Sequence, residues 1–187
     1  MIENFVVHPD QGKNQETDVD ILGVRFPYRA ENLIRPMEDD ARFSIKSDRP
    51  QIIIAEVKSK LCNLNGPWTD PDRGNMHKVL RAIGAFSESK TDLIAKALYL
   101  HGCYEDQGYE ISLVCIGGQR NEEVAAKFPQ VRQILWAEVL DFIFRRFKEY
   151  KHQKVAHPQW DATGKRLWTA ATKAKDEAAF KAVIEVL

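Results

Sequence analysis

Residues Gln51 to Lys60 read QIIIAEVKSK, and this stretch decides the fold. The residues from Ile52 to Ala55 are all apolar, and charged and apolar residues alternate after them. This pattern is typical of a buried central strand whose end reaches a functional surface of the protein. Side chains on a strand alternate between the two faces of a sheet, so Glu56 and Lys58 project to the same side. We therefore predict a central strand that presents a carboxylate and an ammonium together at its end.

Two apolar runs upstream of this strand predict a β-hairpin. The first lies within residues Ile2 to His8, and the second runs from Val19 to Phe26 with a glycine as a candidate bulge. The segment from Tyr28 to Pro50 that follows is irregular and charged, with a brief edge strand expected at Phe43 and Ile45. A connection of this length is typical of a surface excursion or a functional loop.

Downstream, helical and strand-like patterns alternate. Helices are predicted after Asp70-Pro71, over Thr91 to His101 with Leu93, Ile94 and Leu98 in the core, over Asn121 to Phe128, over Ala137 to His152 and from Asp176 onwards. Strands are predicted over Tyr109 to Ile116 and Val131 to Trp136, and turns at Asn65-Gly66-Pro67 and at Asp161-Ala-Thr-Gly164. This order predicts an α/β fold with a mixed central β-sheet flanked by α-helices. We expect one domain over residues 1–187, with a C-terminal helical extension over 155–187.

Composition narrows the classes of function. Lys plus Arg and Asp plus Glu both number 27, so the formal net charge is zero, which excludes histone-like binding by bulk charge but leaves room for a local basic groove. The 3 cysteines have no paired metal-ligand spacing, so we expect free thiols in a reducing cytosol. No apolar run approaches the length of a membrane span. We therefore expect a cytoplasmic protein with no membrane partner.

Two carboxylates are predicted to meet at the end of the central strand. If Val19 to Phe26 pairs beside this strand, Asp20 comes close to Glu56, with Lys58 on the same face. Two adjacent carboxylates repel each other unless a cation lies between them, and hard oxygen ligands suit Mg²⁺ or Mn²⁺, with the main-chain carbonyl of Val57 as a further ligand. In phosphodiester hydrolysis, Lys58 would orient or deprotonate the attacking water or offset charge in the transition state. The plain alternative is a strand-end ion pair between Glu56 and Lys58.

These residues form a pattern that is known from a nuclease family. The segment TDVDILGV, from Thr17 to Val24, is followed after a loop by IIIAEVKS, from Ile52 to Ser59. Together they resemble the D…(D/E)-x-K signature of the PD-(D/E)XK nuclease superfamily, and within it the Holliday-junction-resolvase-like and Mrr-like branches. The resemblance implies a restriction-endonuclease-like fold and a Mg²⁺-dependent endonuclease that acts on DNA.

The resemblance also assigns roles to individual residues. Asp20 and Glu56 would bind the metal, Lys58 would be the catalytic lysine, and Asp18, two residues before Asp20, would assist at the metal. Family members usually carry a helix before the first strand, whereas this chain begins almost at its first strand. Either the helix is lost, or a neighbouring subunit of a homodimer or the C-terminal helix would fill its place, or the chain is a shortened form.

Basic residues supply candidate contacts to nucleic acid. Lys60 lies just beyond the central strand, and Arg145, Arg146 and Lys148 lie at the far end of the helix predicted over Ala137 to His152. The specific interpretation is contact with phosphates, and the general one is solvation together with favourable charge at a helix C-terminus. Both interpretations stay open from the sequence.

Two other classes of function stay open as well. The first is a catalytically inactive module of the same fold that binds DNA or another protein. The second is a nucleotide-binding α/β protein, which is disfavoured because Gly117-Gly118 is not part of a G-x-G-x-x-G phosphate-binding loop.

Overall fold

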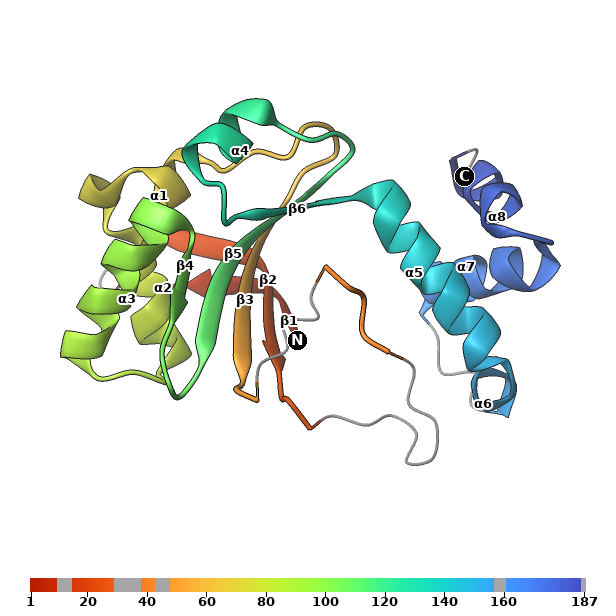
Figure 1. The fold of residues 1–187 in the computed structure, drawn as a ribbon, viewed down its shortest axis with the longest axis horizontal. Helices are drawn as coiled ribbons and strands as arrows, with labels where there is room; N and C mark the ends of the chain where they lie inside the picture. Colours follow the sequence, from red (N-terminus) through yellow and green to blue (C-terminus); the bar gives the residue numbers. More distant parts are fainter. Residues whose placement is uncertain (10–14, 29–37, 43–47, 157–160, 186–187) are drawn as a thin grey trace. The chain divides into compact units, whose positions relative to one another are not determined.

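The computed structural model describes residues 1–9, 15–28, 38–42, 48–156 and 161–185. They form a mixed α/β structure built on a six-stranded sheet flanked by helices (Figure 1). The strands are β1 (Ile2–Val7), β2 (Thr17–Arg25), β3 (Gln51–Val57), β4 (Cys103–Glu105), β5 (Glu110–Gly117) and β6 (Arg132–Leu135). The predicted fold class, a mixed sheet with flanking helices, is confirmed. The predicted edge strand at Phe43 and Ile45 lies outside the described residues.

The strand order places β3 in the middle of the sheet. The order is β1-β2-β3-β5-β4, with β6 pairing β5 beyond the point where β4 ends. Strands β1, β2 and β3 pair antiparallel, β3 pairs β5 in parallel, and β5 pairs β6 in parallel. Parallel strands are usually covered on both faces, which explains why β3 and β5 read as continuous apolar runs rather than as alternating ones.

The contacts of the chain divide it into two compact units, which we describe one at a time. Unit 1 comprises Met1–Arg29 and Ser44–Leu135, and unit 2 comprises Ala30–Phe43 and Trp136–Leu187. The second boundary between the units therefore lies between Leu135 and Trp136, well before residue 155, where the helical extension was expected to begin. The expectation of a single domain stays a prediction.

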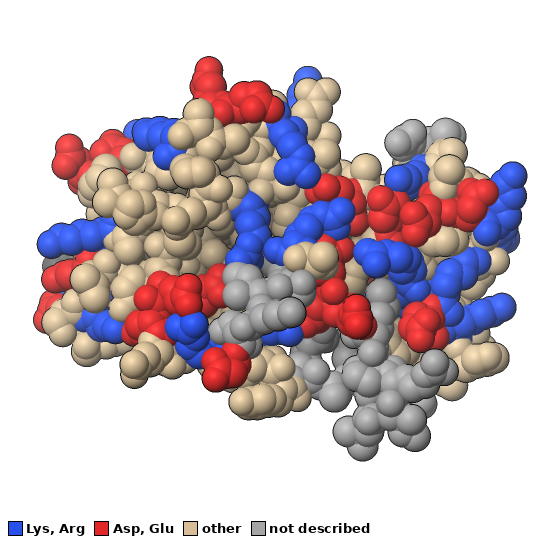
Figure 2. All heavy atoms as spheres, in the orientation of Figure 1, with Lys and Arg blue, Asp and Glu red and all other residues tan. Residues whose placement is uncertain are grey.

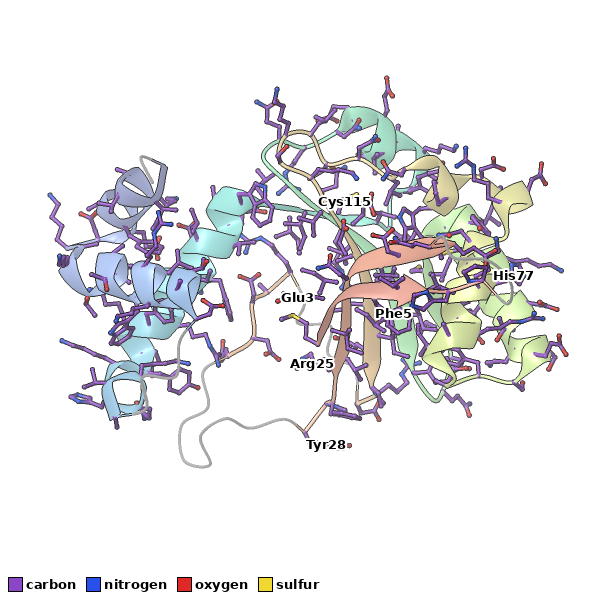
Figure 3. The ribbon with its side chains drawn as sticks, turned by 180° about the vertical axis from the view of Figure 1, so that it is seen from behind. Glu3, Phe5, Arg25, Tyr28, His77 and Cys115 are labelled. Atoms are coloured by element: carbon purple, nitrogen blue, oxygen red, sulfur yellow. The ribbon has the colours of Figure 1, made fainter. Side chains whose placement is uncertain are left out.

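The helices of unit 1 are α1 (Gly66–Thr69), the 3₁₀ helix η1 (Pro71–Arg73), α2 (Asn75–Ile83), α3 (Glu88–His101) and α4 (Glu122–Lys127). Helices α1, α2 and α3 gather on one side of the sheet (Figure 1). The core between them includes Ile54 from β3, Leu113 from β5 and Leu80 from α2. Figure 3 shows Phe5 on the helix side of β1, while Glu3 and Arg25 lie on the other side of the sheet.

In the segment that follows β3, the structure differs from the sequence prediction at Asp70 and at residues 65–67. Asp70 does act as an N-cap, but its side chain accepts a hydrogen bond from the backbone of Asp72 and opens η1, and α2 begins only after Gly74 in the left-handed conformation. The predicted turn at residues 65–67 instead leads directly into α1. Proline favours the first turn of a helix as readily as a β-turn, so the sequence signal is shared by both structures.

The core face of α3 was predicted with one error. Ile94 and Leu98 are buried as expected, whereas Leu93 is 52% exposed. The buried stripe of this helix also contains Thr91 and Ala95, which rotates its centre away from Leu93. The helix ends at Gly102 in the left-handed conformation, as predicted.

Unit 2 is helical and has its own core. Its helices are α5 (Trp136–Glu149), α6 (Lys151–Ala156), α7 (Ala162–Lys173) and α8 (Glu177–Glu185). Phe144 packs on Phe180 with ring centroids 5.5 Å apart, and Phe147 meets Trp168 edge to face. The turn predicted at 161–164 is wrong, because the side chain of Asp161 accepts a hydrogen bond from the backbone of Gly164 and starts α7.

Two further findings concern the cysteines and the helices. All 3 cysteines are free. Among the helices that the structure describes, none is both long enough and apolar enough to cross a membrane.

Candidate active site

The strand that carries Asp20 is irregular at this residue. The ladder between β1 and β2 omits the pair of Asn4 and Asp20, and Asn4 has a φ of 50°, in the left-handed region that asparagine tolerates better than most residues. Val19 and Leu22 are both buried in the core, so the alternation of faces along β2 slips by one residue between them. Asp20 is therefore outside the regular pairing of the strand.

The side chain of Asp20 instead bonds to the backbone of β3. Its Oδ2 accepts a hydrogen bond of 2.7 Å from the N–H of Val57. The backbone ladder between β2 and β3 ends at the pair of Ile21 and Ala55. Beyond this pair, the Asp20 carboxylate takes the place of a backbone carbonyl of β2 as the acceptor for the N–H of Val57. The structure thus joins Asp20 to the residue that separates Glu56 from Lys58.

The main-chain carbonyl of Val57 faces the same way as its N–H. In a strand, the N–H and C=O of one residue point toward the same neighbouring strand. The N–H of the next residue, Lys58, points to the other side and bonds to the carbonyl of Ile116 on β5 at 2.8 Å. Across a trans peptide bond, the carbonyl of Val57 points away from that N–H. The Val57 carbonyl is therefore directed toward β2, where Asp20 lies.

Glu56 is buried and accepts hydrogen bonds from three side-chain donors. It is 6% exposed, and it continues the core face of Ile52 and Ile54. Its Oε1 accepts hydrogen bonds from the ammonium of Lys58 and the amide of Asn65, and its Oε2 accepts one of 2.8 Å from the indole N–H of Trp68. A buried carboxylate without such partners would be strongly destabilising. The ion pair of the plain alternative is present in the structure.

From the sequence, Asn65 and Trp68 are candidates for contact with a substrate, with turn formation as the other interpretation of Asn65; the structure bonds both side chains to Glu56. The chain that leaves β3 turns back over the end of this strand and carries both residues onto the carboxylate of Glu56. One signal for them exists in the sequence, since a buried tryptophan needs an acceptor for its N–H and the strand before it supplies a carboxylate. The direction of that turn cannot be read from local sequence.

The loop after Lys58 rests on the glycine pair that ends β5. A Cβ on Gly117 would lie 2.9 Å from both the backbone nitrogen and the sulfur of Cys62, and one on Gly118 would lie 3.1 Å from the carbonyl of Lys60. The N–H of Cys62 bonds to the carbonyl of Gln119 at 2.8 Å. The two glycines therefore permit a close approach of two backbones, a role that the sequence alone did not indicate.

A thiol lies beside the carboxylate but is poorly suited to nucleophilic chemistry. Cys115 on β5, labelled in Figure 3, pairs with Glu56 in the parallel ladder and is buried. Burial raises the pKa of this thiol to about 12, with a further contribution from Cys62 and Glu56. The thiol is therefore protonated near neutral pH, and the thiolate is the reactive form of cysteine.

The other predicted residues near this end of the sheet are exposed. Asp18 lies on β2, and Lys60 lies beyond the end of β3. Neither is part of the hydrogen bonds that join Asp20, Glu56 and Lys58 to their partners. Their roles as metal and phosphate contacts stay predictions.

The three predicted cations of α5 make contacts within unit 2. Arg145 pairs with Asp40 at 3.3 Å, Arg146 lies over the ring of Tyr150 at 5.3 Å, and the ammonium of Lys148 bonds to the carbonyl of Ala174 at 3.0 Å. Figure 2 shows Lys and Arg interspersed with Asp and Glu over the helices of this unit, at the right of the view. A contact with phosphate by these residues stays a prediction.

Carboxylate and carbonyl oxygens near the end of β3 are the kinds of atoms that a hard divalent cation binds. Among the residues that the structure describes, no group of three or more His, Cys, Asp or Glu side chains could hold a metal ion. The predicted set is smaller, with two carboxylates and one carbonyl. Oδ1 of Asp20 accepts no hydrogen bond from any described residue, and Oε2 of Glu56, with one donor, has a lone pair left. Oxygens of this kind, completed by water, fit Mg²⁺ or Mn²⁺.

Comparisons of the chain with models of protein families, with curated proteins and with solved structures found no match.

Proposed function

We propose that the protein is a Mg²⁺-dependent nuclease of restriction-endonuclease-like fold that hydrolyses phosphodiester bonds in DNA. The observation that carries this proposal is the hydrogen bond between the Asp20 carboxylate and the backbone N–H of Val57. It joins a residue from a strand far earlier in the sequence to the segment that contains Glu56 and Lys58. The spacing of these residues is the one for which the chain resembles the PD-(D/E)XK superfamily.

Each residue has a distinct role in the proposal. Asp20 and Glu56 bind the cation through carboxylate oxygens, and Val57 contributes its main-chain carbonyl. When bound, Mg²⁺ polarises the phosphoryl oxygen and makes a coordinated water more acidic. Lys58, which already contacts Glu56, orients the attacking water or offsets negative charge that develops on the phosphate.

The first experiment tests Lys58 as a catalytic residue. The variant Lys58→Ala should lose cleavage of DNA while it keeps its fold and its affinity for DNA, because its ammonium acts in the transition state. Cleavage should be measured with Mg²⁺ on single-stranded, duplex and branched DNA and on RNA. Lys96→Ala, at an exposed position of α3, serves as the matched control. Equal turnover by Lys58→Ala and wild type would remove the catalytic assignment.

A second candidate is a module of the same fold that binds DNA or a protein without catalysis. The observation in its favour is that Glu56 is 6% exposed and already accepts hydrogen bonds from Lys58, Asn65 and Trp68. A carboxylate held in this way also anchors α1 to β3. Titration with Mn²⁺ in a calorimeter separates the candidates: saturable binding that is lost in Asp20→Ala supports the enzyme. Binding of DNA without any binding of Mn²⁺ supports the module.

A further inference from the structure

We propose that Trp68 and Asn65 are positioning residues that fix the carboxylate of Glu56 for the divalent cation, an inference that rests on the proposed function. Neither residue touches the reacting atoms in this proposal. Both act through Glu56, and the structure supports this with three separate observations.

The first observation is the placement of the two donors on one carboxylate. The indole of Trp68 bonds to Oε2, and the amide of Asn65 bonds to Oε1. The terminal torsion of a glutamate is broad and is poorly fixed by the side chain itself. Donors on both oxygens fix the plane of the carboxylate, and therefore the direction of the lone pair on Oε2 that remains for a cation.

The second observation is that Asn65 does not perform its usual local function. It occupies the N-cap position of α1, where an asparagine side chain commonly accepts a hydrogen bond from the first turn of its own helix. Its side chain makes no capping bond here and its amide is directed to Glu56. Local helix stability therefore does not account for the orientation of this amide.

The third observation is the rigid support of Trp68. Its side chain is 3% exposed and lies in the core between the sheet and the helices. The preceding residue, Pro67, offers its carbonyl to the hydroxyl of Tyr99 on α3, and the same hydroxyl accepts a hydrogen bond of 3.0 Å from the backbone of Met76 on α2. The indole donor is thus supported by two neighbouring helices. Partners of this kind commonly change metal affinity by about 10- to 100-fold when they are removed.

The test measures Mn²⁺ affinity by calorimetry and needs no catalytic turnover. Trp68→Phe removes the N–H and keeps an aromatic ring, and Asn65→Ala removes the amide at an exposed position. We expect both variants to bind Mn²⁺ about 10- to 100-fold more weakly than wild type. Trp168→Phe is the matched control, because Trp168 packs on Phe147 in unit 2 and should leave the affinity unchanged.

A spectroscopic signature accompanies the affinity. Binding of Mg²⁺ at Glu56 should change the fluorescence of Trp68, because the indole N–H bonds to Oε2 of the same carboxylate. The change should persist in Trp168→Phe and disappear in Trp68→Phe. A purely structural role of Trp68 predicts neither the signal nor the weaker binding in a folded variant.

The outcomes are distinct. Wild-type affinity for Mn²⁺ in folded Trp68→Phe overturns the inference. If that variant does not fold, Asn65→Ala decides: weaker binding of Mn²⁺ supports the inference, and unchanged binding overturns it. Absence of Mn²⁺ binding in the wild type overturns both this inference and the proposed function. Binding that depends on Asp20 and Trp68, without cleavage of any nucleic acid, overturns the nuclease and supports the positioning role.

Discussion

The ammonium of Lys58 is bonded to Oε1 of Glu56, two residues before it on β3. An internal cation therefore neutralises the carboxylate that is proposed to bind a divalent cation. The variant Lys58→Met should remove this competition and bind Mn²⁺ several-fold more tightly, although it loses cleavage. Calorimetry measures the affinity, with Lys181→Met, which removes a lysine that pairs with Asp141 in unit 2, as the control. Weaker binding by Lys58→Met would show that the lysine helps to hold Glu56 rather than competing for it.

The glycine at the end of β5 permits a close approach that a side chain would block. Because a Cβ on Gly117 would lie 2.9 Å from the backbone of Cys62, Gly117→Ala should destabilise the protein by about 1 to 3 kcal/mol. Gly23→Ala, where the nearest atom would be 3.8 Å away, should be neutral or stabilising by about 0.5 kcal/mol. Urea denaturation of both variants checks this, and equal stabilities would contradict the close packing of the loop on β5.

The left-handed residue opposite Asp20 offers a test of the irregular ladder. A β-branched side chain is strained at the φ of 50° of Asn4, so Asn4→Val should cost about 1 to 2 kcal/mol, whereas Asn4→Gly should change the stability by less than about 0.5 kcal/mol. Urea denaturation gives both values. Equal stabilities of Asn4→Val and Asn4→Gly would contradict the left-handed conformation of Asn4 and would indicate regular pairing of β1 with β2 at this position.

One prediction concerns the dependence of stability on pH. A hydrogen bond from Lys90, followed by one from the backbone of Gly108, holds the pKa of Asp106 well below its usual range. The folded protein thus binds this proton less tightly than the unfolded chain, so the stabilisation is complete above the usual carboxyl pKa of about 4 and is lost as the pH falls. Asp106→Asn should therefore be less stable than wild type at pH 7, by a margin that shrinks toward pH 2. A margin that stays constant across this range would contradict the low pKa.

The cations of α5 can be tested through the salt dependence of DNA binding. If Arg145, Arg146 and Lys148 contact phosphates, their replacement by neutral residues should flatten the plot of log affinity against log salt by about 0.9 for each phosphate that is no longer neutralised. Binding of duplex DNA at several salt concentrations measures this slope. An unchanged slope removes these residues from the interface and leaves them with their partners inside unit 2.

Much of the sheet could be predicted from the sequence because its central strands carry strong local signals. The apolar runs of β3 and β5 are long enough to distinguish from loops, and the order of strands and helices along the chain allowed the mixed sheet to be inferred. Strand β4 was missed because its 3 residues are too few to show a period. Helix α7 was missed because the residues that start it, Asp161 to Gly164, are equally typical of a turn.

The hydrogen bonds of the candidate site were predictable only where they are local in sequence. The contact of Glu56 with Lys58 follows from their spacing on one strand. The bond from Asp20 to Val57 depends on an irregular ladder in a different strand pair, and the bonds from Asn65 and Trp68 depend on the path of a turn. Tertiary structure sets these features, and local patterns do not encode them.

Unit 2 draws its residues from two stretches, Ala30–Phe43 and Trp136–Leu187, that are separated by most of unit 1. During synthesis, Asp40 and Arg42 emerge from the ribosome long before Arg145 and Glu138, with which they form ion pairs. Every strand of the sheet has been synthesised by the end of that interval, when Asp40 and Arg42, which also pair with each other, still lack these later partners. A chain that ended at Leu135 would therefore contain every strand of the sheet and lack the helix with which Asp40 and Arg42 form these ion pairs.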